Sequence, residues 1–321
     1  MSLASLYGLC PSPPARFAMM VAVIVACTSA NDHARAEAAP QPVAQFQAQA
    51  AQSAAFASDR LSVEVIGTGP DVILIPGLAS SKEVWRPLAT RLAATHRVHL
   101  VQLAGFAGAS WSHGDGPFVA PEVEELARYI DQAGLDRPAV IGHSMGGLSG
   151  LMLAQRHPEK VGRLMIVDAL PFYSALFGPG VTVEQARPFA DQAAAMILAA
   201  DTTAFEAQQS QTAAGLARDP AMRQTMVEWS MASDRHAMAT AMKDVMTTDL
   251  RPGLATMTTP VTALYAADAD GGPPPAMADA TWTREYATLP GVKLVRVDDS
   301  RHFIMADQPA RFEALVDDFL K

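Results

Sequence analysis

Cysteine is scarce in this chain, whose 321 residues include only Cys10 and Cys27. Both lie so near the amino terminus that cleavage of a leader after Ala30 would leave the mature protein with none. A disulfide framework is then excluded, because it needs pairs of cysteines. The same count excludes a cysteine nucleophile and a thiolate metal site.

Positive charge is also in short supply. The chain has 24 Lys and Arg against 33 Asp and Glu, a formal net charge of −9, and its basic residues form no cluster. Nucleic acids and anionic membranes attract clustered Lys and Arg, so we expect neither as a partner. The 50% of apolar residues is enough for the core of one large α/β domain. The composition does not indicate an oligomeric state.

A membrane-spanning run is missing, although a shorter apolar run lies near the amino terminus. Residues 17–27 are apolar, follow Arg16 and precede three small residues that end at Ala30. This pattern is typical of an export signal, and the run is shorter than the roughly twenty residues that span a bilayer. We predict a signal peptide at residues 1–30, no integral membrane segment after its removal, and a periplasmic or secreted protein. The alternative is a lipoprotein anchored through Cys27, because the residues before it resemble a lipoprotein cleavage box.

The pattern after the leader predicts an α/β protein. Residues 31–58 are rich in Ala and Gln and are predicted to be a low-complexity linker. Beyond them, short apolar runs alternate with segments of helical spacing, which predicts a mostly parallel sheet with helices on both faces. The predicted strands are residues 61–66, 72–75, 98–103, 139–141, 163–167, 261–265 and 292–297. The first two are expected to form a hairpin, because a turn with two glycines and a proline joins them.

Strand patterns stop at about residue 170 and return only at residue 261. The segment between them is rich in Ala, Met and Gln and has helical character. We therefore predict an α/β core made of residues 59–170 and 256–321, with an inserted helical cap, or lid, at residues 171–255.

The strongest chemical signal is Gly142-His143-Ser144-Met145-Gly146. It matches the pattern G-x-S-x-G and lies directly between a predicted strand and a predicted helix, which is the context that a nucleophile elbow requires. In such a turn the serine hydroxyl stands clear of the sheet, and glycines are needed where a Cβ would collide with neighbouring backbone. The motif predicts Ser144 as a nucleophile.

A serine hydroxyl becomes nucleophilic only when a base removes its proton, so a histidine partner is required. Among the eight histidines, His302 follows the last predicted strand and precedes the terminal helix. This places it at the carboxyl edge of the sheet, where the sites of open parallel sheets lie. His302 is therefore the predicted base. His96, His99 and His157 are interpreted as solvated or capping residues, and His113 and His236 as residues that could line a pocket.

The base needs a carboxylate that holds the imidazole in one tautomer. Asp268 and Asp270 both follow the predicted strand at residues 261–265, and Asp168 follows the strand at residues 163–167. We favour Asp268, because it lies close to the end of its strand, and keep Asp270 and Asp168 as alternatives. For the oxyanion that forms on the substrate, we expect the backbone N–H groups of Met145 and Leu78 as donors.

These motifs resemble the α/β-hydrolase superfamily, and in particular its capped members. The matching pieces are Pro76-Gly77-Leu78, Gly105 to Ser110, the turn at Ser144, and Ser300 to Phe303, which together extend over most of residues 61–320. The resemblance implies an eight-stranded, mostly parallel sheet, a helical lid over the site, no cofactor and no metal. Two positions depart from the family pattern: Pro76 stands where histidine is common, and the turn at Asp268 lacks the usual glycine.

The resemblance implies a serine hydrolase. Haloalkane dehalogenases and epoxide hydrolases of this fold use an aspartate nucleophile, which Ser144 argues against. We expect a small-molecule carboxylic ester to be cleaved through an acyl-enzyme. The alternatives are a lactonase, an amidase, a C–C bond hydrolase, a cofactor-free haloperoxidase or a non-catalytic binding module, since one fold serves many functions.

Overall fold

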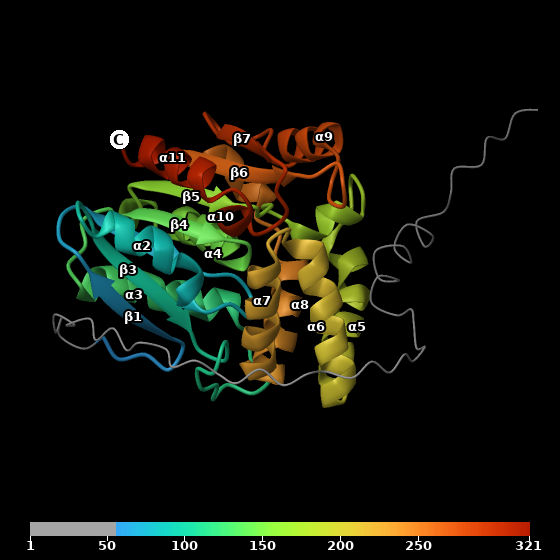
Figure 1. The fold of residues 1–321 in the computed structure, drawn as a ribbon. Helices are drawn as coiled ribbons and strands as arrows, with labels where there is room; N and C mark the ends of the chain where they lie inside the picture. The colour runs from blue at the N-terminus through green and yellow to red at the C-terminus, as the bar shows by residue number, and fades with distance from the viewer. Residues whose placement is uncertain (1–55) are drawn as a thin grey trace, which may run out of the picture. The chain divides into compact units, whose positions relative to one another are not determined.

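Seven strands form one sheet in the computed structural model, which describes residues 56–321 (Figure 1). The predicted signal peptide and residues 31–55 of the predicted linker lie outside the described residues. The sheet order is β1-β3-β2-β4-β5-β6-β7, and every pair of neighbours is parallel except β1 and β3. The strands are β1 (Leu61–Ile66), β2 (Asp71–Ile75), β3 (Arg97–Leu103), β4 (Ala139–His143), β5 (Arg163–Val167), β6 (Val261–Ala267) and β7 (Lys293–Asp298).

This architecture confirms the predicted fold class of a mostly parallel sheet with helices on both faces. The described residues form seven strands where the resemblance implies eight, and the strands coincide with the seven predicted runs to within a few residues.

The expected hairpin of β1 and β2 is wrong. β3 lies between these strands, antiparallel to β1 and parallel to β2. The turn at Gly67 packs against the segment between α2 (Arg86–Leu92) and β3, where a Cβ on Gly67 would overlap the carbonyl O of His96. A turn between two strands therefore did not imply that they pair.

Helices cover both faces of the sheet because its central strands are apolar on both sides. In β2, Val72 and Leu74 pack into one buried cluster and Ile73 and Ile75 into another. The first cluster includes residues of α2, α10 (Ile304–Asp307) and α11 (Pro309–Leu320). The second includes residues of α3 (Val119–Gln132), α4 (Met145–Arg156) and α9 (Pro275–Glu285).

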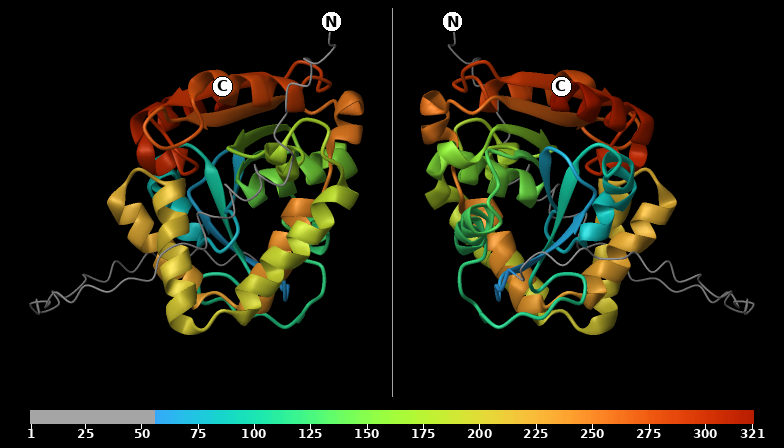
Figure 2. Two further views of the ribbon diagram at one scale, coloured as in Figure 1. Left: turned by 90° about the vertical axis from the view of Figure 1, so that its right-hand side faces the viewer. Right: turned by 90° about the vertical axis from the view of Figure 1, so that its left-hand side faces the viewer.

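The segment between β5 and β6 holds four α-helices: α5 (Val183–Ala199), α6 (Thr202–Leu216), α7 (Pro220–Ala232) and α8 (Arg235–Thr247). Asp201, Asp219 and Asp234 start the last three helices, because each carboxylate accepts a hydrogen bond from a backbone N–H of the first turn. α5 packs on α8, and α6 on α7. In Figure 2 the two pairs diverge like the arms of a V.

The described residues also form short 3₁₀ helices: η2 (Lys82–Trp85), η3 (Pro158–Lys160), η4 (Tyr173–Phe177) and η5 (Arg251–Thr256).

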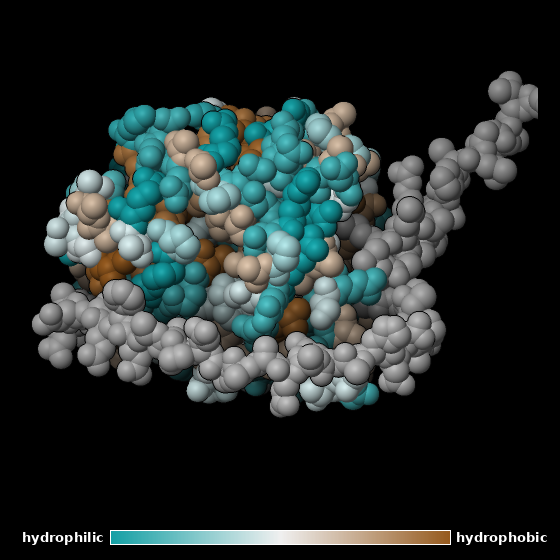
Figure 3. Space-filling view, in the orientation of Figure 1, coloured by the Kyte–Doolittle hydropathy of each residue, from teal (hydrophilic) through white to brown (hydrophobic). Residues whose placement is uncertain are grey.

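The face drawn in Figure 3 is largely hydrophilic, with hydrophobic residues in small separate patches. The large apolar side chains that stand exposed among the described residues are Leu176, Leu198 and Met277. No helix within residues 56–321 combines the length and the apolar character needed to cross a membrane.

Candidate active site

Ser144 occupies a strained turn between β4 and α4. Its backbone has φ 54° and ψ −122°, a conformation that residues other than glycine rarely adopt. Hydrogen bonds hold the turn: the Ser144 N–H donates to the carbonyl O of Val167 at 2.9 Å, and the Ser144 carbonyl accepts from the N–H of Leu148 at 3.0 Å. A strained residue that the surrounding structure holds this firmly is typical of a functional site.

Two glycines make this turn possible. A Cβ on Gly142 would overlap the carbonyl O of Gly146, and a Cβ on Gly146 would overlap the carbonyl O of Ile75. The obstructing atoms belong to the backbone, so a rotamer change cannot remove the clash. The two glycines of the motif therefore allow β2, β4 and α4 to approach one another at the turn.

His302 lies in the loop between β7 and α10, and its ring nitrogen Nδ1 is 2.7 Å from Oδ2 of Asp168. Asp168 directly follows β5 and has a positive φ of 52°. Its other oxygen, Oδ1, accepts a hydrogen bond from the N–H of Ala266 on β6 at 2.9 Å. Both carboxylate oxygens of Asp168 are thus fixed by hydrogen bonds, one to the backbone of the neighbouring strand β6 and one to the imidazole of His302.

The expected partnership of Asp268 with His302 is wrong. Asp268 follows β6 and is fully buried, but its Oδ1 accepts from Nη1 of Arg218 at 2.7 Å and its Oδ2 from Nε of Arg301 at 2.8 Å. Burial alone would raise the pKa of Asp268, yet the hydrogen bond from Arg301 and the nearby positive charges hold it below its ordinary value. Asp270 is also away from this role, because it is exposed, with its carboxylate 3.9 Å from Arg218.

His143 connects the Ser144 turn to the loop of His302. Its buried ring donates a hydrogen bond from Nε2 to the carbonyl O of His302 at 3.0 Å, and the centroids of the two rings are 4.6 Å apart. Burial and the neighbouring His302 lower the pKa of His143 well below its ordinary value, so the ring is neutral. A neutral imidazole that donates through Nε2 leaves Nδ1 without a proton, and Nδ1 faces Gly77. This contact was not predicted from the sequence.

Of the two expected oxyanion donors, Met145 directly follows Ser144, and Leu78 directly follows Gly77, which lies against Ser144. Met145 is the first residue of α4, so its N–H has no partner within the helix. Leu78 follows Gly77, and a Cβ on Gly77 would lie 3.1 Å from the Cβ of Ser144. Within residues 56–321 neither N–H donates a hydrogen bond to another protein group. Both N–H groups therefore stay available to an acceptor outside the protein.

Tyr286 forms a hydrogen bond to the segment that follows Asp168. Its buried hydroxyl donates to the carbonyl O of Ala169 at 2.6 Å, one residue beyond Asp168. Burial, with the nearby charge of Asp168, raises the pKa of Tyr286, so the phenol stays protonated and donates. Sequence reasoning missed this residue, because a tyrosine after a helix has no pattern that distinguishes it from ordinary core.

The other histidines within residues 56–321 have partners away from the Ser144 turn. His99, interpreted from the sequence as solvated or capping, is buried, and it contacts Tyr129 Oη at 2.6 Å and Asp71 Oδ1 at 2.9 Å. His236, which could have lined a pocket, is exposed and pairs with Asp115.

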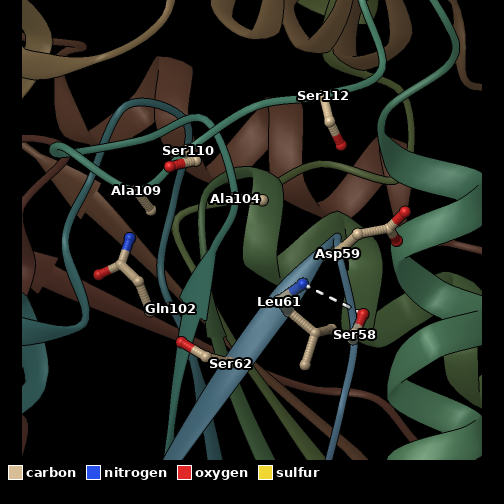
Figure 4. Close-up of a pocket in the computed structure, with 9 residues that line it drawn as sticks. All are labelled: Ser58, Asp59, Leu61, Ser62, Gln102, Ala104, Ala109, Ser110 and Ser112. Carbon is tan, nitrogen blue, oxygen red and sulfur yellow. Dashed lines mark hydrogen bonds between the residues drawn. The ribbon is translucent and has the colours of Figure 1, made fainter.

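A shallow hollow of about 240 Å³ lies at the start of β1. Ser58, Asp59 and Leu61 line it together with Ser110 and Ser112 of the loop after β3 (Figure 4). None of the residues that line this hollow belongs to the Ser144 turn.

The described residues hold no group of three His, Cys, Asp or Glu that suits a metal ion.

The chain belongs to the α/β hydrolase family, since the model of that family matches residues 72–315. Among curated relatives, a pimeloyl-(acyl-carrier protein) methyl ester esterase of Aeromonas salmonicida is 34% identical over 115 residues, which are 36% of this chain and 44% of that protein. The match therefore spans less than half the length of this relative.

Solved structures resemble the fold over most of the chain. A thermophilic esterase from Thermogutta terrifontis has a TM-score of 0.67 at 20% identity and covers 81% of this chain and 92% of its own. An enol-lactonase from Burkholderia xenovorans LB400 has a TM-score of 0.66 at 19% identity, with coverage of 81% and 96%. At these identities the likeness shows the fold alone.

Proposed function

We propose that this protein is a hydrolase of small-molecule carboxylic esters that acts through a Ser144-His302-Asp168 triad and an acyl-enzyme. The observation that carries the proposal is the 2.7 Å contact between His302 and Asp168, at the sheet edge where the strained turn presents Ser144. A carboxylate bound to Nδ1 fixes the tautomer in which Nε2 can accept a proton.

The chemistry follows from these placements. His302 takes the proton of the Ser144 hydroxyl through Nε2, and the Ser144 oxygen attacks the ester carbonyl. The carbonyl oxygen becomes negative and is held by the N–H groups of Leu78 and Met145. The tetrahedral intermediate collapses, and the alcohol leaves with the proton from His302. Water, deprotonated by His302, then hydrolyses the acyl-enzyme and restores Ser144.

The names of the relatives support an ester as the substrate class. The curated relative is named a methyl ester esterase, and the two structural neighbours an esterase and an enol-lactonase. A lactone is a cyclic ester and needs the same steps, so a lactonase is the nearest variant of this proposal.

Labelling with a fluorophosphonate tests the nucleophile, because the probe reacts with activated serines. We expect labelling of the wild-type protein at Ser144, none of Ser144→Ala, and turnover of short p-nitrophenyl esters by the wild type alone. Lactones and amides, assayed beside the esters, assign the substrate class. An unlabelled and inactive wild type would instead favour a binding module of the same fold. Turnover of amides or C–C substrates without any ester would refute the ester assignment.

A further inference from the structure

Asp268 joins two segments that are far apart in the chain. Its Oδ1 binds Arg218, in the turn between α6 and α7, and its Oδ2 binds Arg301, which directly precedes His302. The carboxylate is fully buried while carrying these two partners. A buried carboxylate that accepts two charged hydrogen bonds holds both donors in fixed positions.

Asp307 repeats this arrangement with backbone groups. Its Oδ1 accepts from the N–H groups of Arg218 and Asp219, at 2.8 and 3.0 Å, and its Oδ2 accepts from the N–H of Arg301 at 2.8 Å. Each of the two carboxylates therefore binds the α6–α7 turn with one oxygen and the loop of His302 with the other.

Further hydrogen bonds join the same two segments. The N–H of Phe303 donates to the carbonyl O of Leu216 at 3.1 Å, and Nη1 of Arg301 donates to the carbonyl O of Ala214. Residues 214–219 of the cap are thus bound to residues 301–307 by side chains and backbone together. The residues immediately before and after His302 both take part.

We propose that Asp268 is a positioning residue that ties the α6–α7 turn of the cap to the loop of His302, and so couples the order of the cap to the placement of the base. The coupling to catalysis rests on the proposed function, whereas the tie itself does not. Asp268 follows β6 at the sheet edge and bonds to neither His302 nor Asp168 among the described residues, so it acts through Arg301 and Arg218.

Hydrogen–deuterium exchange tests the tie without any substrate. In Arg218→Met, which removes the cap-side partner and leaves the Asp268–Arg301 pair, we expect amide exchange to rise about tenfold in residues 214–219 and also in residues 301–307. Asp268→Asn should raise exchange in the same two segments. The matched control is Asp317→Asn, because Asp317 is an exposed carboxylate paired with Arg91 at 2.8 Å. It should leave both segments unchanged.

Kinetics test the coupling to the base. We expect Arg218→Met to lower kcat for a p-nitrophenyl ester about tenfold and to shift the acidic limb of its pH profile, with Ser144 still labelled by the phosphonate. The double variant Arg218→Met/Asp268→Asn should lose no more than the worse single variant, because both changes break one network. Arg218→Lys, which keeps a charge near Asp268, should recover part of the rate.

Unchanged exchange in residues 301–307 of folded Arg218→Met would overturn the tie. A normal pH profile and additive losses in the double variant would overturn the coupling. If the wild type neither reacts with the phosphonate nor cleaves esters, the proposed function fails, and the exchange experiment still decides whether Asp268 joins the two segments.

Discussion

Asp168 and His302 are joined by a hydrogen bond of 2.7 Å, although 134 positions separate them in the chain. Asp168 directly follows β5, which is the neighbour of the strand that leads to Ser144, whereas Asp268 follows β6. β4 and β5 are neighbours in register, with His143 opposite Val167. Two members of the proposed triad are therefore held by adjacent strands of one rigid sheet.

Replacement of this acid is the sharpest test of the triad. We expect Asp168→Asn to lower kcat by about 10³- to 10⁴-fold, because the amide no longer favours the required tautomer of His302. Circular dichroism should show a folded protein. Asp268→Asn is the comparison and should cost far less. An equal loss in both, or full activity of Asp168→Asn, would contradict the assignment.

The sheet was predictable because its central strands are buried on both faces, which leaves uninterrupted apolar runs such as Val72 to Ile75 in the sequence. The Ser144 turn was predictable because its geometry needs glycines at fixed places. Which strands pair was harder to predict from the sequence. The turn at Gly67 is typical of a hairpin, yet β3 lies between β1 and β2.

The choice between Asp168 and Asp268 was out of reach for a related reason. Both follow a strand at the same edge of the sheet, so position alone does not separate them. The two residues differ because both carboxylate oxygens of Asp268 bind arginines, Arg218 and Arg301. These are tertiary contacts, so the sequence does not reveal them. The contact of the buried His99 with Asp71 was missed likewise, since a histidine within a strand does not reveal its partner.

Substitution of His143 tests how His302, the proposed base, is held in place. His143→Phe keeps a ring but leaves the carbonyl O of His302 without its donor, and we expect it to lower the free energy of unfolding by about 1 to 3 kcal/mol and to reduce kcat. His143→Gln retains an N–H donor and should recover part of both losses. Urea unfolding and ester turnover measure them. A Phe variant as stable and active as the wild type would show that the contact is dispensable.

We expect the stability of the protein to depend on pH because Glu122 is buried and has a raised pKa. It is fully buried between α3 and α4, where Ser149 Oγ donates to its Oε2 at 2.7 Å, and burial raises its pKa from the ordinary 4.5 to about 8. Between these two pH values the folded state binds more protons than the unfolded state. The free energy of unfolding should therefore fall as pH rises, by about 4 to 5 kcal/mol over the whole window.

Glu122→Gln removes this titration and keeps the size of the side chain. Urea unfolding near pH 5 and near pH 8 should show a difference for the wild type that is strongly reduced in the Gln variant. Parallel pH dependence in the two proteins would show that Glu122 is ionised in the folded state.

Two glycine substitutions should have opposite signs. Gly146→Ala places a Cβ against the backbone of Ile75 and is expected to prevent a stable native turn. Gly215 lies in α6, and a Cβ added there would meet no atom within 4 Å, so Gly215→Ala should raise stability by about 0.5 to 1 kcal/mol through helix propensity. Thermal unfolding measures both, and a tolerated Gly146→Ala would contradict the packing of the Ser144 turn.

Export stays a prediction from the sequence, and the mass of the mature protein tests it. Cleavage after Ala30 would yield a chain that begins at Asn31 and carries no cysteine. An acylated Cys27 at the amino terminus would instead establish a lipid anchor. Recovery of the whole chain from Met1, with the protein retained inside the expressing cell, would refute export.

The order of the strands has a consequence for a chain that is still being made. Ser144 and Asp168 directly follow two adjacent strands and are made before the cap, whereas His302 is made after the cap, β6 and β7. A nascent chain in which His302 has not yet been made holds Ser144 without its proposed base. By our proposal, Ser144 therefore becomes nucleophilic only when β7, α10 and α11 have packed onto the sheet. Earlier folding intermediates would not cleave esters.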